Sequence, residues 1–152
     1  MSTLIIEKAK LKKLKDLINL LFDDDLGKDR ENISETSFKN YKKSFIKILN
    51  DPNNEIFIQI LNDQIIGMMQ LTFIPGLSME GIKRCQIESV RIKKDYRNKG
   101  YGTELIEKGI EIAKLNKCGL IQLTSNKKRL NAINFYKKFG FLSTHKSFKL
   151  DL

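Results

Sequence analysis

The residues with the clearest chemical potential lie in one stretch, from Glu88 to Thr103, which has the pattern of a strand, a basic loop and the start of a helix. The loop holds Arg97 and Lys99 and is followed by Gly100 and Gly102. Glycine adopts positive φ without a steric penalty and lets the backbone come close to a ligand. The first N–H groups of a helix have no partner inside the helix, and they carry the positive end of its dipole. This combination predicts a site that holds a pyrophosphate group.

The stretch matches neither of two common nucleotide-binding motifs. A Walker loop would end in Gly-Lys-Ser or Gly-Lys-Thr, and that ending is missing. The dinucleotide fingerprint needs a third glycine, which is also missing. The two glycines alone therefore favour phosphate binding only weakly.

The chain carries a formal net charge of +10, and much of the excess lies in the C-terminal third. No acidic residue occurs between Glu111 and Asp151, although lysine and arginine are frequent there. A positive surface attracts phosphate-bearing partners. Nucleic acid and a phosphorylated cofactor are both such partners, and charge alone does not separate them. Ordinary solvated lysines explain the same pattern.

Hydrophobic periodicity places this stretch in a chain of mixed helices and strands. Short apolar runs predict strands over 4–6, 55–61, 65–73, 84–92 and 120–124, with a closing β segment over 141–150. Apolar residues at steps of three and four predict helices over 9–22, 34–49, 100–115 and 132–139. The order indicates an α/β (α+β) fold with a mixed sheet. The length of 152 residues fits one domain over residues 1–152.

Composition excludes several classes of protein. With 41% hydrophobic and 30% charged residues the chain can bury a core, which a disordered chain cannot. No apolar run approaches the roughly 18 residues of a membrane span. Cys85 and Cys118 are too far apart for a local Cys-x-x-Cys motif, and the single His and scattered carboxylates form no metal-ligand cluster. We expect a soluble, cytoplasmic protein with two free thiols, no metal and no membrane partner.

Two segments resemble the GNAT superfamily of N-acetyltransferases. The strand Ile87–Ile92, followed by Arg97-x-x-Gly100-x-Gly102, looks like the acetyl-CoA-binding motif of that family. The run from Arg129 to Phe141, with its Phe-Tyr pair and Gly-Phe exit, is similar to the family's later helix. The first strand and the Leu-rich first helix fit the usual opening of such domains. The resemblance implies a single-domain GNAT fold with a twisted, mostly antiparallel sheet flanked by helices, and acetyl-CoA as co-substrate.

The resemblance also implies a role for each matching residue. Val90 and Ile92 would offer backbone groups to the pantetheine arm. The pyrophosphate would be wrapped by Arg97, Asn98, Lys99, Gly100, Tyr101, Gly102 and Thr103. Asn126 and Arg129 stand where relatives often contact the cofactor, although many relatives have Asn at the position of Arg129. Tyr136 aligns with the tyrosine that commonly protonates the departing CoA thiolate.

Acetyl transfer to an amine needs a base, an oxyanion donor and an acid. The attacking amine must be neutral, and Glu88, beside the thioester in the family, is the candidate base or water-organiser. Burial beside Ile87 and Val90 would make this carboxylate a better base. The Val90 N–H would stabilise the oxyanion, and Tyr136 would supply the proton. A paired strand carboxylate and a packing tyrosine are the structural alternatives for these two side chains.

The acceptor side is less defined. His145 lies in a tail that resembles that of small-amine acetyltransferases, including those acting on aminoalkylphosphonates, and it would line the acceptor pocket or be a solvated histidine. Asp23-Asp24-Asp25 falls between the first two helices, which border the acceptor site in the family. The run would attract a cationic amine, or form an ordinary solvated loop. We expect transfer to a small primary amine in a ternary complex, because no cysteine in the motif could carry the acetyl group.

Other functions stay open at this point. Acetylation of a protein N-terminus or lysine is the nearest alternative. A non-catalytic acyl-CoA sensor would more naturally lack Tyr136 or Glu88, and both are present. A basic nucleic-acid-binding module would interleave exposed aromatic residues with its lysines, whereas Phe135, Tyr136 and Phe139 follow a core period, so nucleic acid is disfavoured. A homodimer is expected only because relatives commonly form one.

Overall fold

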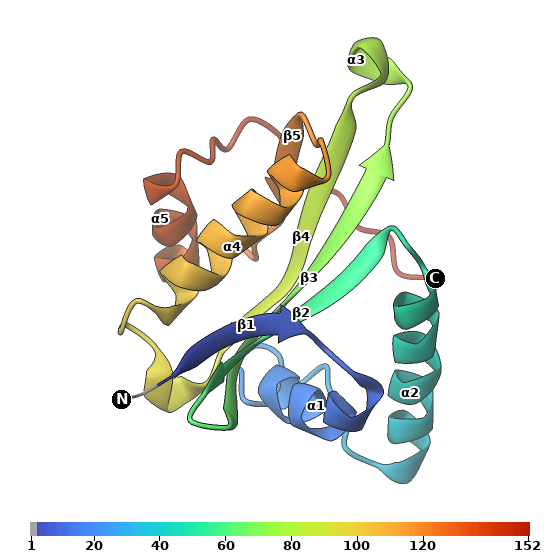
Figure 1. Ribbon diagram of the computed structural model, residues 1–152, viewed down its shortest axis with the longest axis vertical. Helices are drawn as coiled ribbons and strands as arrows, with labels where there is room; N and C mark the ends of the chain where they lie inside the picture. The colour runs from blue at the N-terminus through green and yellow to red at the C-terminus, as the bar shows by residue number, and fades with distance from the viewer. Residues whose placement is uncertain (1–2) are drawn as a thin grey trace.

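The computed structural model describes residues 3–152 and places a five-stranded sheet between two layers of helices (Figure 1). The strands are β1 (Leu4–Lys8), β2 (Asn54–Leu61), β3 (Gln64–Pro75), β4 (Lys83–Ile92) and β5 (Leu120–Leu123). They lie in the order β1-β2-β3-β4-β5. Pairing is antiparallel from β1 to β4 and parallel between β4 and β5. The prediction of a mixed, mostly antiparallel sheet is confirmed.

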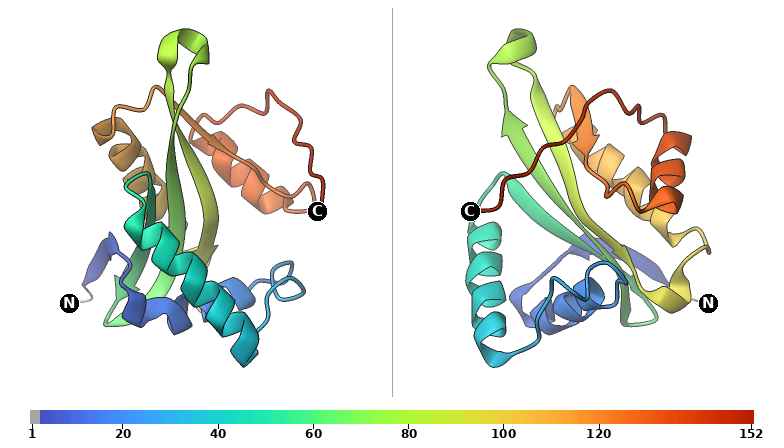
Figure 2. Two further views of the ribbon diagram at one scale, coloured as in Figure 1. Left: turned by 90° about the vertical axis from the view of Figure 1, so that its right-hand side faces the viewer. Right: turned by 180° about the vertical axis from the view of Figure 1, so that it is seen from behind.

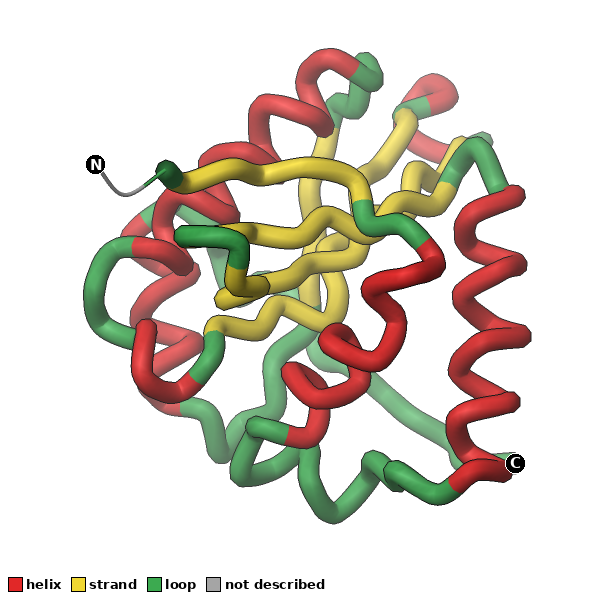
Figure 3. The backbone as a smooth tube through the Cα atoms, turned by 60° about the horizontal axis from the view of Figure 1, so that its bottom comes forward, coloured by secondary structure: helices red, strands yellow, loops and turns green. Residues whose placement is uncertain are grey.

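Helices cover both faces of this sheet (Figure 3). They are α1 (Leu14–Phe22), α2 (Glu35–Asn50), the short α3 (Ser78–Gly81), α4 (Tyr101–Leu115) and α5 (Leu130–Lys138), with 3-10 turns at Leu11–Lys13 and Lys94–Tyr96. On one face Leu17, Ile18 and Phe45 of α1 and α2 pack with Met68 of β3. Among the described residues, no helix has the length and apolar character needed to cross a membrane.

The other face of the sheet carries α4 and α5. Leu105, Ile106 and Ile112 of α4 pack against Met69 of β3 in a second core. Met68 and its neighbour Met69 therefore point into opposite layers, as the two-residue period of a strand requires. This arrangement places β4 and the start of α4 side by side. The stretch predicted to hold a pyrophosphate group includes the end of β4 and the start of α4.

Local signals in the sequence explain where several elements begin. The Ser34 hydroxyl accepts a hydrogen bond from the Ser37 N–H at 3.2 Å and so caps α2. Asn62 and Asp63 have φ of 47° and 63°, which suits the tight turn between β2 and β3. The start of α2 thus follows from a serine that can cap it, and the turn between β2 and β3 follows from two residues that tolerate positive φ.

The predicted β segment over 141–150 is wrong. Residues 142–152 form an extended C-terminal arm without helix or strand, which runs along the outside of the molecule (Figure 2). Leu142 is 82% exposed, Phe148 92% and Leu150 84%. Apolar alternation favours a strand only where a neighbouring strand pairs with it and a core receives its side chains, and within residues 3–152 no strand pairs with the arm.

The apolar stripe of α2 is narrower than its spacing suggests. Phe45 is buried, whereas Phe38 and Ile46 are each 39% exposed and Leu49 is 45% exposed. These three side chains lie outside the core that α1, α2 and the sheet share. Periodicity located the helix correctly and overestimated the width of its buried face.

Candidate active site

β4 is irregular at the point where it leaves β5. The two strands pair only between Arg84–Ile87 and Leu120–Leu123. Just beyond, Ser89 has φ 52°, and Ser89 and Val90 together face the single residue Met69 of β3. Such a bulge bends a strand and changes the direction of the side chains that follow. Within the described residues, β4 beyond this point has no strand partner on its β5 side, which leaves an edge for an extended ligand.

Val90 and Ile92 lie on this open edge. The Val90 carbonyl accepts a hydrogen bond from Arg91 Nη1 at 2.9 Å. The Ile92 carbonyl accepts one from Arg97 Nε, also at 2.9 Å. Each carbonyl has one donor and keeps a second lone pair, so a ligand on this edge can bind to N–H groups and to the remaining lone pairs.

The basic loop after β4 enters α4 through two left-handed residues, Asn98 with φ 60° and Gly100 with φ 90°. Gly100 stands at the cap position of α4 and no side chain caps the helix. A Cβ on Gly100 would meet nothing within 4 Å, so its positive φ, rather than crowding, favours glycine there. Tyr101, Gly102 and Thr103 form the first turn, whose N–H groups and dipole suit a pyrophosphate. Lys99 lies over the Tyr96 ring, 5.8 Å from its centroid.

Gln59 of β2 holds this first turn in place, and the sequence analysis missed it. Its side chain is fully buried, and Nε2 donates to the Tyr101 carbonyl at 3.1 Å. Gly67 lies opposite Gln59 on β3, and a Cβ there would come within 2.8 Å of Gln59 Oε1. Oε1 has no hydrogen-bond partner among residues 3–152. A polar residue inside an otherwise apolar strand, with a glycine in the next strand, is the signal that could have revealed this role.

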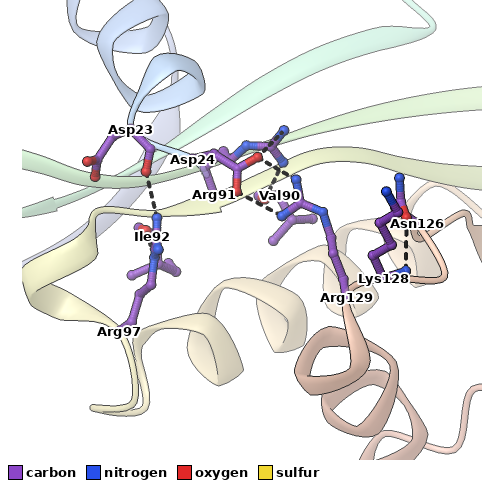
Figure 4. A network of polar contacts seen from close by, with 9 residues as sticks. All are labelled: Asp23, Asp24, Val90, Arg91, Ile92, Arg97, Asn126, Lys128 and Arg129. Carbon is purple, nitrogen blue, oxygen red and sulfur yellow. Dashed lines mark hydrogen bonds and ion pairs between the residues drawn. The ribbon is translucent and has the colours of Figure 1, made fainter. Parts of the chain in front are cut away.

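The loop between α1 and α2, residues 23–34, is tied to the site through Asp24 (Figure 4). Asp24 is 7% exposed, and its two carboxylate oxygens accept hydrogen bonds from both terminal nitrogens of Arg129. The bond from Nη1 measures 2.8 Å. Arg91 Nη2 lies 3.6 Å from the same carboxylate. We call Asp24, Arg91 and Arg129 the Asp24 cluster.

Asp23 makes a second connection between this loop and the end of β4. Its carboxylate accepts the Lys94 N–H at 2.9 Å. Its carbonyl accepts a hydrogen bond from Arg97 Nη2 at 2.7 Å (Figure 4). Asp23, Asp24 and Asp25 line an open hollow of about 400 Å³ together with Lys28 and Lys94. The acidic run is therefore largely bound to cationic and N–H groups of its own chain.

Burial and charge act in opposite directions on the Asp24 cluster. Burial alone would raise the pKa of Asp24, but the hydrogen bonds from Arg129 and the charge of Arg91 hold it below its ordinary value. Burial lowers the pKa of Arg91, whose Nε has no partner among the described residues. Burial raises the pKa of Tyr136, and the charges of Arg91 and Arg129 offset part of that rise. One carboxylate and two guanidinium groups thus leave a net positive charge that acts on Tyr136.

Tyr136 lies on α5 and is half-buried. Its ring makes edge-to-face contacts with Phe135 at 5.3 Å and Phe141 at 5.9 Å between centroids. Asn126 shapes the turn before this helix: its Oδ1 accepts the Lys128 N–H at 2.9 Å, and its carbonyl accepts the Arg129 N–H at 2.9 Å. Asn126 therefore has a structural task beside the expected contact with the cofactor.

Comparison with known proteins identifies this arrangement. The model of the acetyltransferase (GNAT) family matches residues 14–141. The chain belongs to the GNAT family. It is 31% identical over 116 residues to streptothricin acetyltransferase A of Bacillus subtilis (strain 168). The aligned segment covers 74% of this chain and 62% of that protein. The chain thus spans less than two thirds of that relative.

Solved structures place almost the whole chain in the same fold. The crystal structure of a transcriptional regulator from Bacillus halodurans C-125 is 36% identical, with a TM-score of 0.94 over 99% of this chain and 100% of that one. A predicted acetyltransferase from Clostridium acetobutylicum, solved with acetyl-CoA, is 21% identical, with a TM-score of 0.77 over 98% of this chain and 96% of that one. The second likeness shows the fold alone.

Two residues assigned from the GNAT resemblance lie in exposed positions. Glu88 is exposed and faces Gln70 of β3, so it lacks the burial expected to make it a better base. His145 lies in the exposed C-terminal arm, where its Nδ1 is 2.7 Å from the Thr144 hydroxyl. Among residues 3–152, no group of three or more His, Cys, Asp or Glu side chains could hold a metal ion.

Proposed function

We propose that this GNAT protein is an acetyl-CoA-dependent N-acetyltransferase that moves an acetyl group to a primary amine of a small molecule. One observation carries the proposal. The edge of β4 that the bulge at Ser89 leaves unpaired leads into a loop that ends at the uncapped N-terminus of α4. An extended pantetheine arm suits the first feature and a pyrophosphate suits the second.

In this proposal the residues of the chain divide the work along that path. Val90 and Ile92 bind the pantetheine arm through the β4 edge. The loop from Arg97 to Thr103 binds the pyrophosphate, mainly through its N–H groups. Acetyl-CoA supplies an activated acetyl group, which transfers directly when both substrates are held together.

Proton movements complete the proposed reaction. Glu88, directly or through water, removes a proton from the amine, whose nitrogen then forms a bond to the acetyl carbon. The Val90 N–H stabilises the oxyanion. Tyr136 gives its proton to the thiolate as the carbon–sulfur bond breaks. The net positive charge of the Asp24 cluster supports this step, because it stabilises the negative charge that Tyr136 gains when its proton leaves.

The test compares Tyr136→Phe with wild type in a thiol-release assay. Removing a general acid lowers a rate by about 10²- to 10⁴-fold, so kcat should fall by at least about 10²-fold. Binding of acetyl-CoA, measured by calorimetry, should stay unchanged. Tyr96→Phe is the matched control, because the Tyr96 hydroxyl bonds Gln64 at 2.8 Å on the surface. An unchanged kcat in Tyr136→Phe removes the acid role from this residue.

The acceptor panel should contain streptothricin, because a GNAT relative is named for acetylating it. Polyamines, aminoglycosides, aminoalkylphosphonates and peptides complete the panel. Turnover of peptides alone would replace the small-molecule proposal with protein acetylation. Both cysteines are free thiols, which supports the proposal of a reducing, cytoplasmic location. The homodimer stays a prediction that light scattering can test.

DNA binding is a second candidate, since the Bacillus halodurans relative is named a transcriptional regulator. The chain also has a net charge of +10. A gel-shift experiment with duplex DNA over a range of salt concentrations tests it. Binding that weakens steeply with salt and is unaffected by acetyl-CoA would favour this function.

A further inference from the structure

Asp24 receives no role from either GNAT motif, yet it contacts two of the elements that line the proposed active site. It belongs to the loop between α1 and α2, and it binds Arg129 at the start of α5 and Arg91 on β4. Arg129 is 105 residues away in the sequence. A buried carboxylate with this set of contacts links the acceptor side of the fold to the cofactor side.

The chain is shaped around this carboxylate. The N–H groups of Gly27 and Lys28 donate to the Asp24 carbonyl at 2.9 and 2.8 Å, which closes a tight turn. A Cβ on Gly27 would lie 2.8 Å from Asp24 Oδ2 and 2.7 Å from the Leu21 carbonyl. A side chain at position 27 would therefore clash with the Asp24 carboxylate and with the backbone at the end of α1.

The contacts of Asp24 reach the groups that would act on the thioester. Arg91 directly follows Val90, whose N–H is the proposed oxyanion donor. Arg129 precedes the first residue of α5, and Tyr136 lies seven residues later, two turns along the same face. A shift of Asp24 would thus move the open edge of β4 and the helix that carries Tyr136.

The same geometry argues against Arg129 as a ligand of acetyl-CoA. Both of its terminal nitrogens donate to Asp24, in the forked arrangement that guanidinium and carboxylate groups prefer. Turning Arg129 toward a phosphate would leave a buried carboxylate without its main donor, which is strongly unfavourable.

We propose that Asp24 is a positioning residue that fixes the loop, β4 and α5 relative to one another through Arg91 and Arg129. Arg129 then supports turnover of the acceptor and does not bind acetyl-CoA. This inference rests on the proposed acetyltransferase function. It adds a specific structural cause for the alignment of acceptor, thioester and Tyr136.

The experiment measures three quantities in Asp24→Asn, Arg129→Met and the double variant: kcat, KM for the acceptor, and the dissociation constant of acetyl-CoA by calorimetry. Misplacement by about 1 Å can lower a rate on the order of 10²-fold, so each single variant should lose about 10- to 100-fold in kcat/KM for the acceptor. Acetyl-CoA affinity should stay within about threefold. The double variant should be no worse than the worse single variant, because the two residues act as a pair.

Asp29→Asn is the matched control, because Asp29 is an exposed residue of the same loop and loses the same charge. It should behave like wild type. Gly27→Ala gives an independent route, since it crowds the turn that holds the carboxylate without removing its charge, and it should show the same loss of acceptor turnover. Thermal unfolding establishes which variants are folded. Should Asp24→Asn fail to fold, Gly27→Ala and the double variant decide the question.

Two results would overturn the inference. One is an acetyl-CoA affinity that falls tenfold or more in Arg129→Met, which would make Arg129 a cofactor ligand. The other is a folded Asp24→Asn or Gly27→Ala protein that turns over the acceptor like Asp29→Asn. A wild-type protein that acetylates no amine would instead refute the proposed function, and the acetyl-CoA affinities would still decide whether Arg129 binds the cofactor.

Discussion

Replacing Gln59 by leucine should separate stability from cofactor binding. Gln59 is fully buried and holds the Tyr101 carbonyl through a bond of 3.1 Å, while its Oε1 has no partner among residues 3–152. Leucine is one bond shorter but fills a comparable volume, and it removes both polar atoms. The first turn of α4 would lose its tie to the sheet, and the core would lose an unsatisfied carbonyl.

The two effects have opposite signs and similar sizes. A typical hydrogen bond contributes about 1 kcal/mol, and an unsatisfied buried polar group costs about 1–3 kcal/mol. The free energy of unfolding of Gln59→Leu should therefore be unchanged or higher by up to about 2 kcal/mol. If the freed turn must be reordered when acetyl-CoA binds, about 1 kcal/mol of binding free energy is lost. The dissociation constant then rises about fivefold.

Urea unfolding and calorimetry with acetyl-CoA measure these quantities on the same sample. Gln70→Leu is the control, because the Gln70 amide bonds Asn54 at 3.4 Å and not α4. Gln70→Leu should leave acetyl-CoA affinity unchanged. An unaltered affinity in Gln59→Leu would refute the positioning role of the amide. A loss of more than about 2 kcal/mol in stability would show that Oε1 is satisfied by a buried water.

Three further outcomes are expected. Asp24→Asn should lower the free energy of unfolding by about 3 kcal/mol at pH 7. Because the pKa of Asp24 is depressed in the folded protein, wild type loses its extra stability over Asp24→Asn as the pH falls below about 4. Urea titrations from pH 7 to pH 3 should show the unfolding free energies of the two proteins converging. Burial raises the pKa of Cys85 to about 12, so a thiol reagent at pH 8 should label Cys118 first and Cys85 only in the unfolded protein. Ending the chain after Phe141 removes only the exposed C-terminal arm and should shift the unfolding midpoint by less than about 2–4 °C. A loss of acceptor turnover in this otherwise stable protein would place the arm at the acceptor, and His145→Ala in the full chain would then test the histidine itself.

The elements of the fold could be predicted because each has a local cause. The strands of the central hairpin are apolar runs on either side of Asn62-Asp63, and α2 begins at a serine that caps it. The C-terminal arm has the alternation of a strand, but local pattern does not supply the neighbouring strand that such a segment needs. Its prediction failed for that reason.

The site could be predicted only where backbone and short motifs define it. Gly100 and the start of α4 follow from residue type, since positive φ and free N–H groups are local properties. The bulge at Ser89 depends on the register between β3 and β4, which no local pattern encodes. Gln59 and Asp24 act on partners 42 and 105 residues away, so their roles emerge only when the chain is folded.

These distant contacts also change what the basic composition means. Arg97 and Arg129 are two of the cations that suggest a phosphate-binding surface, yet Arg97 bonds the Ile92 and Asp23 carbonyls, and Arg129 bonds the Asp24 carboxylate. These two guanidinium groups thus help to hold the loop between α1 and α2 against β4 and α5. Attraction to phosphate must then depend more on the N–H groups at the start of α4 than on side-chain charge. A count of lysine and arginine therefore overstates the free positive charge at this site, because the fold uses part of that charge to position its own backbone.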